Sequence, residues 1–229
     1  MRAAQAGFPL LIVCATWCSA GEPIADSAVA ASTTAALAAL RALPLAEPVI
    51  ATVRQRSLRP GDTDPADATV LDGTIVLDHP RWSLRLTDPE RPGWLLLLRG
   101  DAFGWEERER LAADDPAPTV TAHAPGADDR HQRRFAALVR RDLDALAQEF
   151  RISATAVPAV GFELRLVPLQ QALRRDWLRA DLLIDPRGLV QRVVVDEAAG
   201  TQRSIQVLSA TTGATIDPSL FAGIARVRR

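Results

Sequence analysis

Few side chains in this sequence are suited to catalysis or metal binding. All 27 basic residues are arginine, and the chain contains no tyrosine, which excludes lysine Schiff bases, phosphate-loop lysines and tyrosine acid–base catalysis. The three histidines, His79, His123 and His131, lack the i, i+4 spacing of a zinc-binding helix. Nucleophile elbows, glycine-rich phosphate loops and dinucleotide fingerprints do not occur either. We expect a protein that is not an enzyme, with no catalytic residue, no metal site and no cofactor.

One acidic cluster partly resembles a calcium-binding loop. It consists of Asp62, Asp64, Asp67 and Asp72, but Pro65 breaks the spacing and no glutamate closes the loop. A solvated turn explains this cluster better than a metal site.

Arginine pairs occur at residues 133–134 and 140–141. Their simplest explanation is the solvated face of a helix, and the alternative is contact with anionic lipid or a partner protein. The Arg-Gly-Asp triplet at residues 99–101 is expected to form a hairpin turn rather than an adhesion signal.

The overall composition limits the possible functions further. The chain has 229 residues, a formal net charge of −1 and 48% hydrophobic residues. It is long enough for one globular domain with a substantial core, and its charge balance fits neither an acidic disordered segment nor a strongly basic nucleic-acid binder. We expect no nucleic acid among its partners.

The N-terminal segment has the organisation of a secretory signal peptide. Arg2 precedes an apolar run over residues 3–17, and small residues ending at Ala20 occupy the positions that signal peptidase reads. We therefore expect residues 1–20 to be removed and residues 21–229 to form a single exported domain. Both cysteines lie within this signal, so no disulfide is expected. The apolar run is too short to span a membrane.

Two segments have helical periodicity. Residues 33–43 are rich in alanine and leucine, and Pro44 ends them. Residues 130–150 have the strongest amphipathic pattern, with a continuous apolar stripe and arginines off that stripe. The second helix must therefore pack on an apolar surface.

Most of the remaining chain alternates between apolar and polar residues, which is typical of strands. Such patterns cover residues 71–78, 81–87, 94–98, 103–105, 162–166, 178–184, 189–196 and 202–209. The last three are joined by short turns and are expected to be consecutive antiparallel strands. The proline-rich residues 114–129 are expected to form a loop. Roughly ten strands with two or three helices on one side indicate an α+β, mostly β, single domain.

The aromatic and leucine residues of these strands allow two interpretations. They form a filled core beneath the helix of residues 130–150, or they line a hydrophobic cavity that this helix covers. Composition does not separate the two, because filled cores and apolar pockets use the same residue types. On the residues alone, the filled core is the simpler interpretation.

Several segments, in order along the chain, resemble the LolA family of periplasmic outer-membrane lipoprotein carriers, and in particular its LolA-like branch. The similarity extends over almost all of residues 21–229. It is carried by the glycine-led strand 73–80 with Trp82 shortly after it, the segment 86–89, the strand-turn-strand 94–105, the helix 135–150, the strand 162–168 and the C-terminal segment 185–221. Their order and spacing are more specific than any one segment.

This resemblance implies an unclosed antiparallel β-barrel, or half-barrel, with lid helices around a hydrophobic cavity. It implies a monomeric periplasmic carrier that takes lipoprotein or lipid cargo from an inner-membrane donor complex and delivers it to an outer-membrane acceptor. The residues expected to line the cavity are Trp82, Leu84, Leu86, Trp94, Leu96, Leu98, Phe103, Trp105, Phe162, Leu164 and Leu166. Those expected to contact the lid are His79, Phe135, Leu138, Val139 and Leu146.

The sequence departs from the family pattern in two places. His79 stands where the family has an arginine that closes the lid, and the acidic, proline-rich residues 114–129 are not typical of the family. Histidine offers fewer donors than arginine and titrates near neutrality, so a looser lid is expected.

The cargo is a lipoprotein or another lipidated product, such as a glycolipid or a polyene lipid. Two other functions stay open at this point. One is a lipid-sensing module of the same fold, and the other is a lipid-processing hydrolase, for which the sequence offers no nucleophile–base pair.

Overall fold

The structure is a computed structural model that describes residues 24–44, 48–62, 64–78, 80–101, 104–112, 117–123, 134, 137–138 and 141–224. The predicted signal peptide, residues 1–20, lies outside the described residues. Within the described ranges, no helix is both long and apolar enough to cross a membrane.

The described elements are two α-helices, three short 3-10 helices and eleven strands. The helices are α1 (Ile24–Ala42), α3 (Leu143–Glu149), η1 (Pro65–Asp67), η3 (Leu173–Arg175) and η4 (Pro218–Phe221). The strands are β1 (Val49–Leu58), β2 (Thr69–Asp78), β3 (Arg81–Thr87), β4 (Leu95–Asp101), β5 (Gly104–Arg110), β6 (Thr119–His123), β7 (Phe150–Val157), β8 (Gly161–Pro168), β9 (Trp177–Ile184), β10 (Val190–Glu197) and β11 (Gln202–Thr212).

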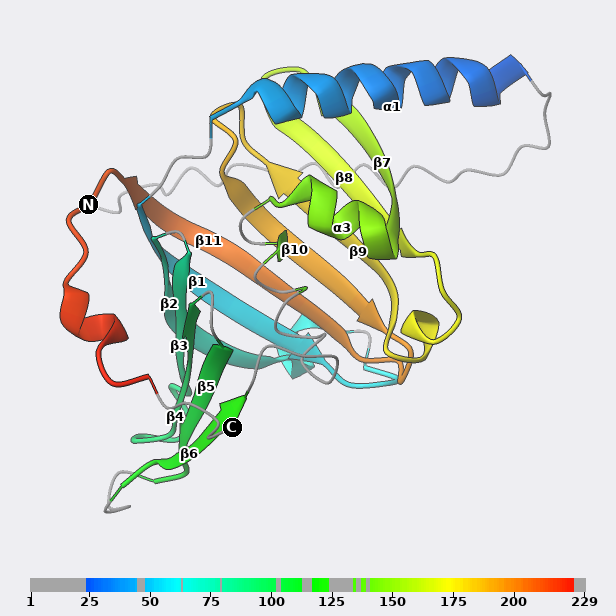
Figure 1. Cartoon of the computed structure of the whole chain (residues 1–229). Coiled ribbons are helices and arrows are strands. Elements are labelled where there is room, and N and C mark those ends of the chain that lie inside the picture. Colours follow the sequence, from blue (N-terminus) through cyan, green and yellow to red (C-terminus); the bar gives the residue numbers. More distant parts are fainter. Residues whose placement is uncertain are drawn as a thin grey trace, which may run out of the picture.

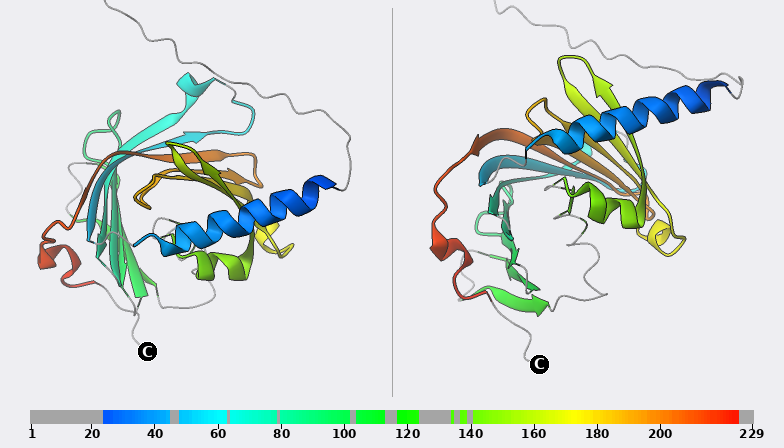
Figure 2. Two further views of the ribbon diagram at one scale, coloured as in Figure 1. Left: turned by 90° about the horizontal axis from the view of Figure 1, so that it is seen from above. Right: turned by 45° about the horizontal axis from the view of Figure 1, so that its top comes forward.

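All eleven strands belong to one antiparallel sheet (Figure 1). Its order is β6-β5-β4-β3-β2-β1-β11-β10-β9-β8-β7, so every strand pairs with its sequence neighbour except β6 and β7, which form the two edges. The first and last strands meet in the middle, where β1 pairs with β11 from Val49 opposite Thr212 to Leu58 opposite Gln202. The described sheet is curved but not closed (Figure 2), which confirms the expected mostly β, unclosed architecture.

The strand predictions hold where the alternation is strong. β3 has the predicted bounds, with Trp82, Leu84 and Leu86 buried and Arg85 exposed. The three consecutive antiparallel strands predicted near the C-terminus are β9, β10 and β11, which pair in that order.

The interior is divided into two clusters of buried apolar residues. The helix-side core joins α1 and α3 to β7–β10 and consists of Ala36, Leu40, Leu138, Leu143, Leu146, Phe150, Ala154, Leu164, Leu166, Trp177, Ala180, Leu182, Ile184, Val193 and Val195. The strand-side core lies on β1–β5 and consists of Val49, Ala51, Val53, Leu71, Ile75, Leu77, Trp82, Leu84, Leu86, Trp94, Leu98 and Trp105. Figure 2 shows both α-helices on the half of the sheet that β7–β10 form.

The prediction of one continuous helix over residues 130–150 is wrong. Arg141 has a φ of 58°, a left-handed conformation that interrupts an α-helix. Asp142 then caps α3, because its carboxylate accepts a hydrogen bond from the Ala145 N–H at 3.0 Å. At the other end, Phe150 is already the first residue of β7. The apolar residues of the predicted stripe are buried as expected, but they continue from a helix into a strand.

Three other expectations need correction. The first helix begins at Ile24, so α1 is longer than the predicted residues 33–43. The predicted loop of residues 114–129 contains β6, which pairs with β5. The predicted turn at residues 99–101 is the end of β4.

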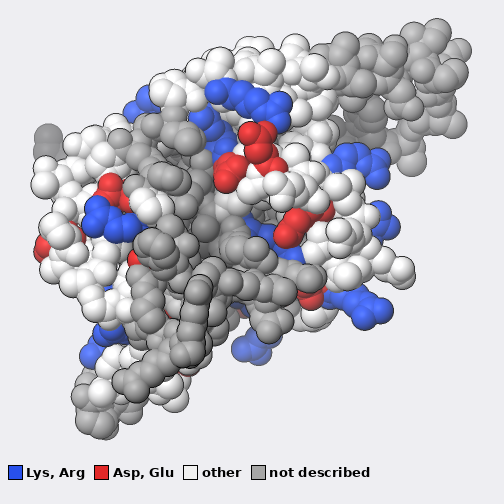
Figure 3. All heavy atoms as spheres, in the orientation of Figure 1, with Lys and Arg blue, Asp and Glu red and all other residues white. Residues whose placement is uncertain are grey.

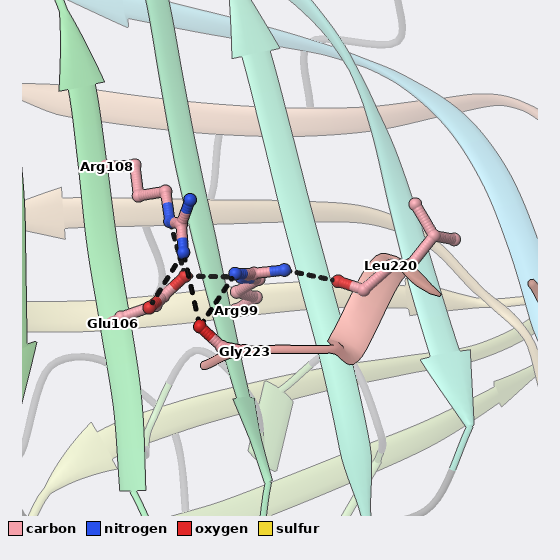
Figure 4. Close-up of polar contacts among 5 residues, drawn as sticks. All are labelled: Arg99, Glu106, Arg108, Leu220 and Gly223. Atoms are coloured by element: carbon pink, nitrogen blue, oxygen red, sulfur yellow. Dashed lines mark hydrogen bonds and ion pairs between the residues drawn. The ribbon is translucent and has the colours of Figure 1, made fainter. Parts of the chain in front are cut away.

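Arg99 is instead buried in a charge network on the face of the sheet opposite the strand-side core (Figure 4). Its guanidinium forms an ion pair with Glu106, which is 0% exposed, and Arg108 Nε lies 2.6 Å from the same carboxylate. Arg99 also donates to the carbonyl oxygens of Leu220 at 2.8 Å and Gly223 at 3.4 Å. These contacts fix the C-terminal segment across β4 and β5, and they satisfy a buried carboxylate that would otherwise be costly.

Candidate functional site

An open cavity of about 480 Å³ lies between the two cores. One side of its wall comes from β3 and β4, where Leu84 lies opposite Leu98 and Leu86 opposite Leu96. Residues directly opposite each other on neighbouring strands point to the same face of a sheet. The alternating pattern of the sequence therefore builds a continuous apolar wall.

The opposite side of the cavity belongs to the helix-side core. Leu138 and Trp177 line it there, together with Val193 and Val195 of β10. The Trp177 ring is held in place by Phe150, at 5.9 Å between ring centroids, and by the Arg134 guanidinium above it. Both cores thus contribute to one cavity.

The apolar surface continues beyond the main cavity along β1 and β11. A second hollow of about 40 Å³ shares Val193 and Ile205 with the main cavity and reaches Val49, and its lining is entirely apolar. From Val49 to Val53, four residue steps of a strand span about 13 Å, and the next residue on this face, Gln55, is polar. The concave face therefore carries an apolar strip.

The structure brings only part of the predicted lining together. Six predicted residues line the main cavity: Leu84, Leu86, Trp94, Leu96, Leu98 and Leu138. Trp82 and Trp105 are buried in the strand-side core, while Leu146, Leu164 and Leu166 are buried in the helix-side core and Phe162 packs against it. These six do not line the main cavity. His79, Phe103, Phe135 and Val139 lie outside the described residues. Binding of lipid by any of these residues stays a prediction.

Sequence reasoning missed the cavity residues that come from β1, β2 and β11. Gln55, Leu71 and Ile205 lie in one row across these strands. Their alternation was visible in part, but the pairing of β1 with β11 joins segments about 150 residues apart, and no local pattern specifies it.

Polar side chains are concentrated at one end of the cavity. At that end β1 and β10 finish and β2 and β11 begin, and the polar lining residues are Ser57, Arg59, Thr69, Glu197 and Arg203. Arg203 Nε lies 2.8 Å from Glu197 Oε1. Another carboxylate, Glu107, lines the cavity beside Leu98 on β5. In the described part of the chain, no group of three or more His, Cys, Asp and Glu side chains is placed to hold a metal ion.

Polar contacts link α1 to the segment that contains α3. Arg141 Nη2 donates to the Leu43 carbonyl, just beyond the end of α1, at 2.8 Å, and Arg41 pairs with Asp144 at 3.1 Å. Figure 3 shows basic and acidic side chains side by side where the two helices meet. Burial lowers the pKa of the Arg141 guanidinium. The helices are therefore joined by a small number of polar bonds in addition to apolar packing.

One arginine of each pair predicted on a solvated helix face is described, and both of these arginines are buried. Arg134 and Arg141 are only 3% and 6% exposed. Arg134 Nε lies 2.6 Å from a Glu149 carboxylate oxygen, and its Nη1 lies 3.6 Å from Asp176. Both described arginines are therefore buried against the protein, and Arg133 and Arg140 lie outside the described residues.

Comparisons with known proteins give structural matches only. No protein-family model and no curated protein matches the sequence. A DUF1329 family protein from Desulfovibrio piger is similar, with 10% identity, coverage of 85% of this chain and 97% of that chain, and a TM-score of 0.44. A LolA superfamily protein from Nitrosomonas europaea is 9% identical over 83% of this chain and 97% of its own, with a TM-score of 0.38. The lipoprotein LppX from Mycobacterium tuberculosis is 12% identical over 84% of this chain and 100% of its own, with a TM-score of 0.41.

Proposed function

We propose that this protein binds the acyl chains of a lipoprotein or another lipidated product in its open apolar cavity. The single observation that carries this proposal is the cavity itself, about 480 Å³ in volume, with leucine, valine and isoleucine side chains on facing walls. Water penalises an exposed acyl chain by about 0.8 kcal/mol per CH₂ group.

The proposed role is that of a carrier in the periplasm. Residues 1–20 have the pattern of a cleavable export signal, and residues 21–229 form the carrier domain. An inner-membrane donor complex loads the cargo, and an outer-membrane acceptor receives it from the monomeric carrier. Because the cavity is open, the cargo leaves it when an acceptor offers a better apolar site.

Substitution of a cavity residue tests binding directly. Leu96 is half-buried and lines the cavity. Leu96→Glu therefore places a carboxylate against the acyl chain without introducing a charge into a fully packed core. We expect a fluorescent acyl probe to bind Leu96→Glu at least about tenfold more weakly, because a buried unpaired charge is costly. The matched control is Leu208→Glu, since Leu208 is an exposed leucine on β11.

Circular dichroism and thermal unfolding establish that both variants are folded before binding is measured. Equal probe affinity in wild type, Leu96→Glu and Leu208→Glu would show that the cavity does not hold the chain. Transfer of a labelled lipid between donor and acceptor vesicles then separates a carrier from a protein that only binds. A carrier accelerates transfer in proportion to its concentration, whereas a sensor retains the lipid.

A further inference from the structure

The ends of the apolar strip differ in chemistry. The hollow that reaches Val49 is lined only by apolar residues. The opposite end of the cavity carries the guanidinium groups of Arg59 and Arg203, with the hydroxyls of Ser57 and Thr69 beside them. A molecule lying along the strip therefore meets apolar surface at one end and hydrogen-bond donors at the other.

The two arginines belong to adjoining segments of the rim. Arg59 follows β1, and Arg203 lies in β11 opposite Ser57, the residue two places before Arg59. The turn between β10 and β11 touches the same segment, since a side chain at Gly200 would come within 3.2 Å of Pro60. The register and this contact place both guanidinium groups at one mouth.

Much of the hydrogen-bonding capacity of these arginines is unused. Arg59 is exposed, and among the described residues its guanidinium has no hydrogen bond or ion pair. Arg203 pairs with Glu197 through Nε at 2.8 Å, and a guanidinium has five N–H donors. Two guanidinium groups and one carboxylate, that of Glu197, line this mouth, and Asp62 adjoins it, since its N–H donates to the Arg59 carbonyl at 3.1 Å.

Resting on the proposed function, we infer that the cargo is an acyl amphiphile with an anionic head group, either a phosphate or a carboxylate. Its chain lies along the strip toward Val49, and its head meets Arg59 and Arg203. Arginine binds planar carboxylates and phosphates through paired N–H donors. With a neutral head group, the guanidinium N–H groups would form hydrogen bonds with water instead.

Three probes with twelve-carbon chains test this assignment: dodecyl phosphate, monolauroylglycerol and dodecyltrimethylammonium. Each displaces a fluorescent acyl probe below its critical micelle concentration and at low ionic strength. We expect wild type to bind dodecyl phosphate about five- to tenfold more tightly than monolauroylglycerol, and the cationic probe most weakly. Added 0.5 M NaCl should remove most of the difference, since the Debye length then falls to about 4 Å.

Variants assign the preference to the mouth. Arg59→Gln with Arg203→Gln should bring the phosphate-to-glycerol ratio close to one, because both guanidinium groups are lost. The matched control is Arg85→Gln, because Arg85 is an exposed arginine on the other face of β3. In Arg59→Glu the order of the anionic and cationic probes should reverse.

The outcomes are distinguishable from those of the proposed function. If no dodecyl probe binds, the acyl-binding proposal itself fails. If all three bind equally, or if the arginine variants keep the preference, the acyl proposal stands and the head-group assignment is overturned. Displacement of dodecyl phosphate by millimolar inorganic phosphate would also overturn it, because it would show a site for free anions rather than for an amphiphile.

Discussion

The two halves of the sheet are built from similar strands but differ in what covers them. On β7–β10, the inward residues are packed beneath α1 and α3, and Leu166 is 0% exposed. On β3 and β4, the inward leucines face a cavity, and Leu96 is only half-buried. Period-two alternation supplies an apolar face in both halves, and helix coverage decides whether that face becomes a filled core or an open wall. The filled-core interpretation therefore describes the helix-covered part of the sheet, and the cavity interpretation describes the space between the two cores, to which both contribute.

The largest expected effect separates the two halves by stability. Leu166→Ala should lower the free energy of unfolding by about 3 kcal/mol, because it leaves a void in a packed core. Leu96→Ala should cost about 1 kcal/mol or less, since its side chain already borders open space. Urea unfolding followed by circular dichroism measures both. Equal losses would mean that the β3–β4 wall is packed as tightly as the helix-covered half.

A smaller effect is expected at the junction between the helices. Arg141→Met removes the hydrogen bond to the Leu43 carbonyl while keeping an apolar stem. We expect amide hydrogen exchange near the end of α1 to rise about fivefold, which corresponds to the loss of one hydrogen bond. Arg41→Gln is the control, because the Arg41–Asp144 pair is solvent-exposed and contributes little. If Arg41→Gln loosens α1 as much as Arg141→Met, the buried bond has no special role.

Local patterns were sufficient for the strongly alternating elements and insufficient for two other features. The bounds of β3 and the order of β9, β10 and β11 follow from alternation and short turns. The break at Arg141 could not be predicted in the same way, because the apolar stripe continues through it and only Asp142 gives a weak capping signal. The pairing of β1 with β11, and with it the far wall of the cavity, depends on long-range contacts.

The sequence also did not predict the buried charged residues. Arg99 and Glu106 were not recognised as partners, because arginine and glutamate on a strand are normally assigned to solvent. Glu106 stands on the face of β5 opposite Trp105 and Glu107, and the C-terminal segment covers it. A charged residue inside an alternating strand can therefore mark a covered face, but only the tertiary structure shows what covers it.

The smallest expected effect concerns an exposed ion pair on the strand-side half. Asp72 accepts a hydrogen bond from Arg54 Nε at 2.7 Å, and this bond lowers the pKa of the Asp72 carboxyl. A carboxyl with a lowered pKa stabilises the fold above its unfolded-state pKa, and this stabilisation is lost as the pH falls through the folded-state pKa. Asp72→Asn should therefore be slightly less stable than wild type at pH 7 and equal to it in strong acid. Thermal unfolding across pH measures the difference, and a gap that persists in acid would assign the effect to something other than this pair.

Quenching of tryptophan fluorescence by a brominated acyl chain tests the central claim most directly. Trp94 lines the cavity, whereas Trp82 is buried in the strand-side core outside its lining. A chain held in the cavity should quench wild type strongly, and Trp94→Phe should lose a much larger share of that quenching than Trp82→Phe. Quenching that is absent, or that falls equally in the two variants, would contradict binding of the acyl chain in this cavity.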